Sequence, residues 1–136
     1  MNRRKFNERR GVTAVEMALT LPVLILLIFG AYELCRANMM KHTAEAATYE
    51  AARVAILPGA QTAEVESVCR QVLATAGIGS AVIEIDPPNL QTQSDLISVT
   101  VSVDYGENTT LAPFFMDDRV LVRRCELSRE IRGGGN

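Results

Sequence analysis

The longest uncharged apolar segment of the chain lies near its N-terminus. The residues from Met17 to Tyr32 carry no charge, and extension back to Val12 gives a 21-residue stretch that only Glu16 interrupts. As a helix rising 1.5 Å per residue, this stretch is about 31 Å long, close to the hydrocarbon thickness of a bilayer. The pattern therefore predicts a membrane-spanning helix. We expect Pro22 to kink it, because proline removes one backbone donor and its ring presses on the preceding turn.

The residues that follow favour a continuation of this helix beyond the membrane. Residues 44–55 consist largely of strong helix formers, and two pairs of opposite charges stand at helical spacing. These pairs are Lys41 with Glu45 and Glu50 with Arg53. Pro58 and Gly59 then end the helix, which we expect to reach about Leu57. The alanines at 44, 47, 51 and 55 form one stripe, which reflects either helix propensity alone or the close approach of another backbone.

The rest of the chain combines a shorter helix with strands. A helix is predicted from Thr62 to Ala76, where Thr62 can cap the first turn and Gly77 can close the last. Three later segments have strand character, namely Ala81–Ile85, Leu96–Tyr105 and Arg119–Leu127. In the middle segment apolar and polar residues alternate, which is typical of a half-buried antiparallel strand. The predicted fold class is α+β, with a long N-terminal helix, a second short helix and a small three-stranded antiparallel sheet.

Length and charge narrow the possible functions. A chain of 136 residues suffices for one compact domain. Its formal net charge of -2 hides a basic tip, because residues 1–11 carry five basic side chains and one acidic side chain. By the positive-inside tendency this tip is cytoplasmic, and the residues after Tyr32 are extracytoplasmic. A basic tip on an acidic body, together with the absence of tryptophan, argues against a nucleic-acid partner.

Several kinds of targeting segment begin with cations and an apolar run. A cleaved secretory signal needs small residues before its cleavage site, whereas the best candidate here has the bulky Phe29 three residues before the cut. Tyr32, Glu33 and Leu34 before Cys35 do not fit a lipoprotein signal. A twin-arginine signal, suggested by residues 3–6, also leads to cleaved export. An uncleaved anchor and a pilin-type signal remain as the better interpretations.

The order of residues around Gly11 favours the pilin-type signal. Arg9 and Arg10 precede Gly11, and Val12 to Glu16 lead into the apolar run. This order resembles a type IV prepilin signal, in which a membrane peptidase cuts after the glycine. The resemblance implies cleavage between Gly11 and Val12, with Glu16 as the glutamate five residues after the cut. It also implies that Glu16 pairs with the free amine of a neighbouring subunit during assembly.

The apolar segment is also similar to the N-terminus of TadE-like proteins, which are pseudopilins or minor pilin-like components of Tad/Flp pilus systems. The similarity lies in the run from Val12 to Leu24, in Phe29–Leu34 with Arg36, and in the step Ala51-Ala52-Arg53. It implies a single-pass inner-membrane protein that reaches the pilus after processing. The implied partners are a prepilin peptidase, other Tad/Flp pilins and pseudopilins, the inner-membrane assembly platform and the lipid bilayer.

The predicted organisation follows from these segments. It consists of a basic prepilin-type leader (1–11), a transmembrane helix segment (12–35), a periplasmic continuation of the helix (36–57), a small α+β extracytoplasmic domain (58–132) and a flexible tail (133–136). The alternative function is an uncleaved single-pass anchor that presents a periplasmic adaptor domain to other envelope proteins. A third class, an anchored enzyme, would require a pocket with convergent polar groups in residues 81–127.

Candidate chemistry outside the membrane segment is sparse. The pattern contains no catalytic motif, and with one histidine and no C-x-x-C pair we expect no metal, no cofactor and no enzymatic activity. Cys69 and Cys125 are candidates for a disulfide if the second helix packs on the last strand. Cys35 would then remain without a cysteine partner in the chain. The apolar residues between Gly106 and Asp118 form either a lid over the sheet or an exposed contact patch, and we favour the lid.

Overall fold

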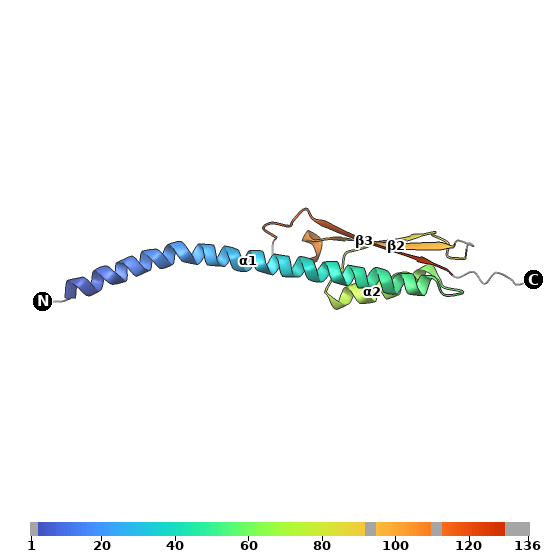
Figure 1. The fold of residues 1–136 in the computed structure, drawn as a ribbon, viewed down its shortest axis with the longest axis horizontal. Helices are drawn as coiled ribbons and strands as arrows, with labels where there is room; N and C mark the ends of the chain where they lie inside the picture. The colour runs from blue at the N-terminus through green and yellow to red at the C-terminus, as the bar shows by residue number, and fades with distance from the viewer. Residues whose placement is uncertain (1–2, 92–94, 110–112, 130–136) are drawn as a thin grey trace, which may run out of the picture.

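A single helix runs through the first two fifths of the chain. The computed structural model describes residues 3–91, 95–109 and 113–129, with side chains from Gly11 onward, so the predicted tail at 133–136 lies outside the described residues. Helix α1 spans Arg3–Ala55 without a break and projects well beyond the folded domain (Figure 1). It ends two residues before the predicted Leu57 and therefore confirms the continuous helix.

The remaining elements form a small layer of sheet and a second helix. Helix α2 spans Thr62–Thr75, and the strands are β1 (Val82–Asp86), β2 (Leu96–Asp104) and β3 (Val120–Ser128). A short 3-10 helix, η1, covers Gly106–Asn108. The sheet is antiparallel throughout in the order β1-β2-β3, with Val99 opposite Ile85 on one side and Cys125 on the other. The predicted α+β class and its three strands are confirmed.

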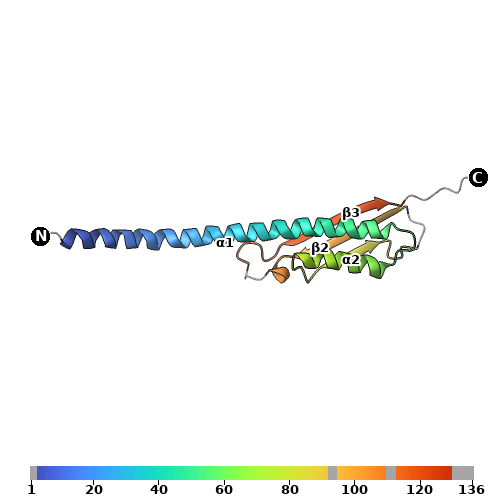
Figure 2. The same cartoon turned by 90° about the horizontal axis from the view of Figure 1, so that it is seen from below.

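Both helices cover the same face of the sheet. Helix α1 packs against β2, β3 and α2, whereas α2 also reaches β1 (Figures 1 and 2). The central strand turns Ile97, Val99, Val101 and Val103 into this interface, where each is at most 1% exposed. The alternation predicted for β2 is thus confirmed, because every second side chain of a strand faces the same layer.

The alanine stripe of α1 forms the helical side of the core. Ala44, Ala47, Ala51 and Ala55 are fully buried against the chain's own elements. Small side chains let α1 lie close to α2 and the sheet, so this stripe serves the fold of the chain itself. At the end of α1 the guanidinium of Arg129 donates to the carbonyl oxygen of Ala55 at 3.0 Å, which satisfies one of the carbonyls that a helix C-terminus leaves unpaired.

Helix α2 begins at Thr62, as predicted, but Thr62 does not cap it. Gln61, not Thr62, is the N-cap residue, and it makes no side-chain capping bond. The Thr62 hydroxyl instead donates to the carbonyl oxygen of Pro88 at 3.1 Å. A tertiary partner is thus preferred to the local cap. Gly77 ends this region at φ +66°, a left-handed conformation that glycine adopts without steric cost.

Candidate functional site: the apolar helix and its junction with the domain

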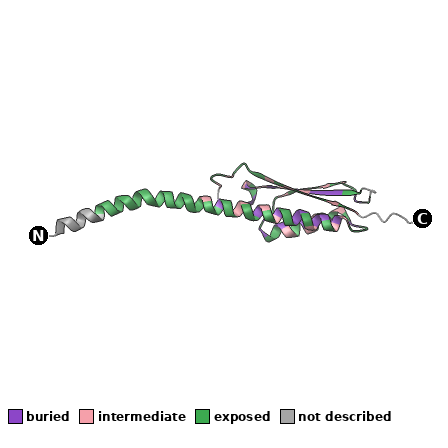
Figure 3. Cartoon of the chain, viewed as in Figure 1, coloured by how far each residue is buried: buried purple, intermediate pink, exposed green. Residues whose placement is uncertain are grey.

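The N-terminal part of α1 has no partner within its own fold. Among the described residues, one helix is long and apolar enough to cross a membrane, and its most apolar window is not buried at all. Figure 3 shows this change along α1, which is exposed over the projecting part and buried only beside the sheet. Because exposed apolar surface is unfavourable in water, this part of the helix requires an apolar surrounding.

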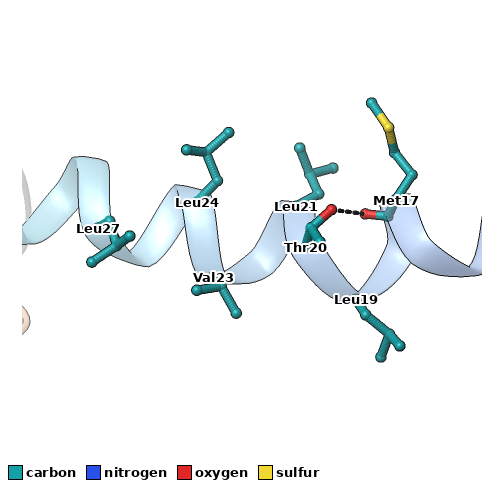
Figure 4. Close-up of a pocket in the computed structure, with 7 residues that line it drawn as sticks. All are labelled: Met17, Leu19, Thr20, Leu21, Val23, Leu24 and Leu27. Atoms are coloured by element: carbon teal, nitrogen blue, oxygen red, sulfur yellow. Dashed lines mark hydrogen bonds between the residues drawn. The ribbon is translucent and has the colours of Figure 1, made fainter.

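The side chains of this exposed segment suit a lipid environment. In Figure 4, Leu21, Leu24 and Leu27 project outward from the helix. The hydroxyl of Thr20 donates back to the carbonyl oxygens of Glu16 at 3.0 Å and Met17 at 3.4 Å. The hydroxyl is therefore satisfied inside the helix, as a polar group surrounded by hydrocarbon must be.

The predicted cleavage bond lies inside α1 and is accessible. Gly11 is exposed, and a Cβ atom at this position would meet nothing within 4 Å. Val12 is 68% exposed. Glycine lowers helix stability by about 1 kcal/mol relative to alanine, so α1 unwinds more readily here than at a neighbouring residue.

Glu16 is the one carboxylate within the apolar stretch. Its side chain is exposed and makes no ion pair with any described side chain. Pro22 lies six residues further along α1. Figure 1 shows the helix axis bending in this part of α1, where proline leaves the carbonyl of Ala18 without its usual backbone donor.

The first charged residue after the apolar run is built into the domain. The Glu33 side chain is only 4% exposed, and its carboxylate accepts hydrogen bonds from the backbone N–H groups of Phe114 and Phe115, the latter at 3.0 Å. The backbone carbonyl of Glu33 accepts a further bond from the Tyr105 hydroxyl at 3.3 Å. Glu33 thereby ties the loop before β3 to the point where the membrane helix meets the domain.

Arg36, one turn further along, performs a matching role. Its guanidinium donates to the carbonyl oxygens of Ala76 at 2.7 Å and Asn108 at 2.9 Å. The Asn108 side chain in turn accepts from the N–H groups of Gly79 and Ser80, both at 2.9 Å. One cation thus joins α1 to the end of α2 and to η1. Charged donors make this kind of bond stronger than a neutral pair.

Burial also affects Tyr105 at this junction. It is fully buried, and loss of hydration of the charged form raises the pKa of its phenol, which a hydrogen bond from Thr109 partly offsets. The phenol therefore stays protonated and serves as a donor to Glu33.

Sequence reasoning used Glu33 and Arg36 only as part of a resemblance and missed their contacts. The available signal was their position, because they are the first charges after the apolar run. Their partners lie 81 and 72 residues further along the chain, beyond the reach of any helical spacing.

The loop before β3 presents two aromatic rings beside the helix. Phe114 and Phe115 are 69% and 60% exposed, whereas Met116 packs partly against the core. The ring centroid of Phe114 lies 5.9 Å from that of Phe29 on α1, and the Phe115 ring lies 3.9 Å from the position of a Cβ at Gly30. The lid favoured from the sequence is therefore wrong for these two rings, because no part of the sheet covers them.

The cysteines are separate in the structure. Cys35, Cys69 and Cys125 are all free thiols, and no Cα atom of α2 lies within 8 Å of one in β3. A disulfide requires Cα atoms about 4.4–6.8 Å apart. The candidate bridge between Cys69 and Cys125 is thus absent, because α1 lies against β3 while α2 lies toward β1. Burial, partly offset by Arg70, raises the pKa of the Cys69 thiol to about 11.

No metal-binding cluster is present in the described part of the chain. Groups of three or more histidine, cysteine or acidic residues in suitable positions do not occur there. His42 is largely exposed, with Nδ1 3.4 Å from Glu45. The other carboxylate oxygen of Glu45 lies 2.9 Å from Nε of Arg123 on β3, and neither His42 nor Glu45 is enclosed.

The apolar helix and the domain form one continuous unit. An exposed apolar helix continues without a break into the core of a small α+β domain, and the buried Glu33 and the half-buried Arg36 fix the junction. Residues 11–53 match the family model described as TadE-like protein, which confirms the resemblance over these residues. Comparisons with curated proteins and with solved structures gave no match. The family match covers both the exposed part of α1 and the part that packs in the domain, and it reaches no residue beyond Arg53.

Proposed function

We propose that this chain is a TadE-like pseudopilin or minor pilin that takes part in assembly of a Tad/Flp-type adhesive pilus through its N-terminal helix. The observation that carries the proposal is the division of α1 into two parts. One part is apolar and unpartnered, and the other is buried in the domain. The family match covers both parts. The chain acts as a structural component and not as an enzyme.

The first proposed step is insertion of the chain into the membrane. The basic leader stays in the cytoplasm, residues 12–35 cross the inner membrane and the domain lies outside. A prepilin peptidase then cuts after Gly11. The exposure of Gly11 and the low helix propensity of glycine support this step, because a peptidase must unwind the bond that it cleaves.

Assembly then relies on Glu16. A charged side chain at the centre of a membrane helix costs about 2.5–3.5 kcal/mol. Glu16 is off-centre, near the positive end of the helix dipole, which makes its cost smaller, but an acid in an apolar stretch still requires a reason. Glu16 has no cationic partner among the described side chains. The free amine of Val12 on a neighbouring subunit supplies one after cleavage, and the apolar faces of the two helices then pack together. Other Tad/Flp pilins and the assembly platform are the expected partners.

The processing step is tested by intact mass and N-terminal sequencing of the full chain, purified from membranes of a host with the matching peptidase. A host without the peptidase is the control. A chain that starts at Val12 only when the peptidase is present supports the proposal. A start at Met1 in both hosts would favour the alternative, an uncleaved anchor with a periplasmic adaptor domain. A start near Tyr32 would identify a secreted domain.

The assembly step is tested by Glu16→Leu, with Met17→Leu as the matched control on the adjacent exposed position. Both variants should insert and be cleaved as the wild type is. Glu16→Leu should lose co-purification with Tad pilins, whereas Met17→Leu should keep it. Normal association of Glu16→Leu would refute the pairing of carboxylate and amine.

A further inference from the structure

The loop between η1 and β3 exposes large apolar side chains, which is unfavourable in water. We name residues 113–116 the aromatic tip. Its rings, Phe114 and Phe115, are mostly exposed, although they are among the largest apolar side chains in the domain. Within the described chain their ring contacts are with each other and with Phe29.

The level of the aromatic tip along α1 gives its depth relative to a bilayer that contains the helix. The Phe114 ring lies beside that of Phe29 in a tilted arrangement and Phe115 lies over Gly30, so both rings stand at the last turns of the charge-free run. Phe29 is 17 residues beyond Val12, or about 26 Å along the helix, which is near the far boundary of a hydrocarbon core of about 30 Å. A membrane that contains this helix therefore has its outer surface at the level of the tip.

The surroundings of the tip have the polarity expected at that boundary. Asp117 and Asp118 follow the rings after one intervening residue and are exposed, and Glu33 and Arg36 come after Phe29 and Gly30 on the way to the domain. Phenylalanine is among the residues that interfacial segments bury about 5–10 Å into the boundary between headgroups and acyl chains. The tip is also held in place, because the Glu33 carboxylate accepts from the backbone N–H groups of both phenylalanines.

We propose that the aromatic tip is a second membrane contact, in which Phe114 and Phe115 enter the outer surface of the bilayer beside α1. This inference rests on the membrane anchoring of the chain but not on pilus assembly or cleavage. The domain then lies on the membrane at two points, the helix and the tip. Because α1 enters the domain without a loop, the second contact restricts rotation of the domain about the helix axis and tilting of helix and domain together.

The chain contains no tryptophan, so a single introduced tryptophan reports its own surroundings. The test uses Phe115→Trp and Phe114→Trp in the full chain, placed at one chain per lipid nanodisc. Leu24→Trp, in the middle of the charge-free run, is the positive control. Tyr49→Trp, on an exposed position of α1 about 30 Å beyond Phe29, is the negative control. Lipids carry bromine either near the glycerol end or near the methyl end of the acyl chains.

We expect the tip variants to lose at least about half of their emission with bromine near the glycerol end and less with bromine near the methyl end, as a shallow contact requires. Leu24→Trp should show the reverse order, and Tyr49→Trp should keep its emission. Tip emission that matches Tyr49→Trp while Leu24→Trp is quenched would overturn the inference and leave the anchor intact. A blue shift of the tip seen only with several chains per disc would also overturn it, in favour of contact between copies. Failure to quench Leu24→Trp would refute the anchoring and the inference together.

Discussion

Removal of the Glu33 carboxylate should release the loop before β3 without unfolding the domain. The carboxylate accepts two backbone hydrogen bonds, and each bond to a charged group contributes about 1.5–3 kcal/mol. The released N–H groups belong to an exposed loop and regain water, and the cost of burying the charge disappears. We therefore expect Glu33→Ala to lower the local opening free energy by about 2–3 kcal/mol, while the melting temperature of the domain changes little.

The assay is hydrogen exchange of the Phe114 and Phe115 amides in the full chain in nanodiscs. A loss of 2–3 kcal/mol corresponds to exchange about 30–150 times faster, because about 1.4 kcal/mol is a factor of ten. Glu33→Gln should give an intermediate value, since the amide offers one acceptor oxygen and its NH₂ group cannot accept. Glu50→Ala is the matched control, because Glu50 is an exposed acid on the same helix whose 3.6 Å pair with Arg53 contributes little. Exchange in Glu33→Ala no faster than in Glu50→Ala would refute the role given to Glu33.

Three further predictions concern single residues. Burial raises the pKa of the Cys69 thiol from 9.0 to about 11, so the protonated thiol stabilises the fold below pH 9 and this stability is lost as pH rises toward 11. The melting temperature of Cys69→Ala should therefore fall less between pH 9 and pH 11 than that of the wild type. Equal falls in melting temperature for the two proteins would contradict the buried thiol. In Arg36→Lys the ammonium group cannot bond to the carbonyls of both Ala76 and Asn108 as the planar guanidinium does. Thermal unfolding should therefore show a free energy of unfolding lower by about 1–3 kcal/mol. An unchanged melting temperature would show that the paired hydrogen bonds are dispensable. Gly11→Ala stabilises the helix at the proposed cleavage bond by about 1 kcal/mol. The rate of cleavage by the peptidase, measured by mass spectrometry, should therefore fall about fivefold. Cleavage at the wild-type rate would exclude local unwinding as a limiting step.

Much of the fold could be predicted because its signals are local. The uncharged run, the helix formers up to Ala55 and the alternation in β2 each depend on neighbouring residues, and the structure has all three. The first residue of α2 was predicted, whereas its cap was not, because the Thr62 hydroxyl donates to the carbonyl oxygen of Pro88, a partner that no local pattern reveals.

The junction could not be predicted for the same physical reason. Glu33 meets Phe114 only after the sheet has folded back along α1, so the pairing depends on the tertiary arrangement. The prediction that the aromatic tip covers the sheet was wrong for a different reason. Apolar residues in a loop favour burial in a protein core when water is the only alternative, but a protein beside a bilayer has a second apolar medium available. The cysteines illustrate a third limit, since Cys69 and Cys125 both face the core but from elements that α1 keeps apart.

The continuity of α1 has a mechanical consequence. A straight α-helix of 53 residues is about 80 Å long, and this one contains no loop between the apolar segment and the alanines that pack on the sheet. A pull applied to the N-terminal part is therefore transmitted directly to the domain, with no flexible linker to absorb it. The domain resists by shear along the whole interface of α1 with the sheet and α2. The bend near Pro22 changes the direction of α1 but introduces no flexible loop, so a displacement of the apolar segment along the helix moves the domain with it.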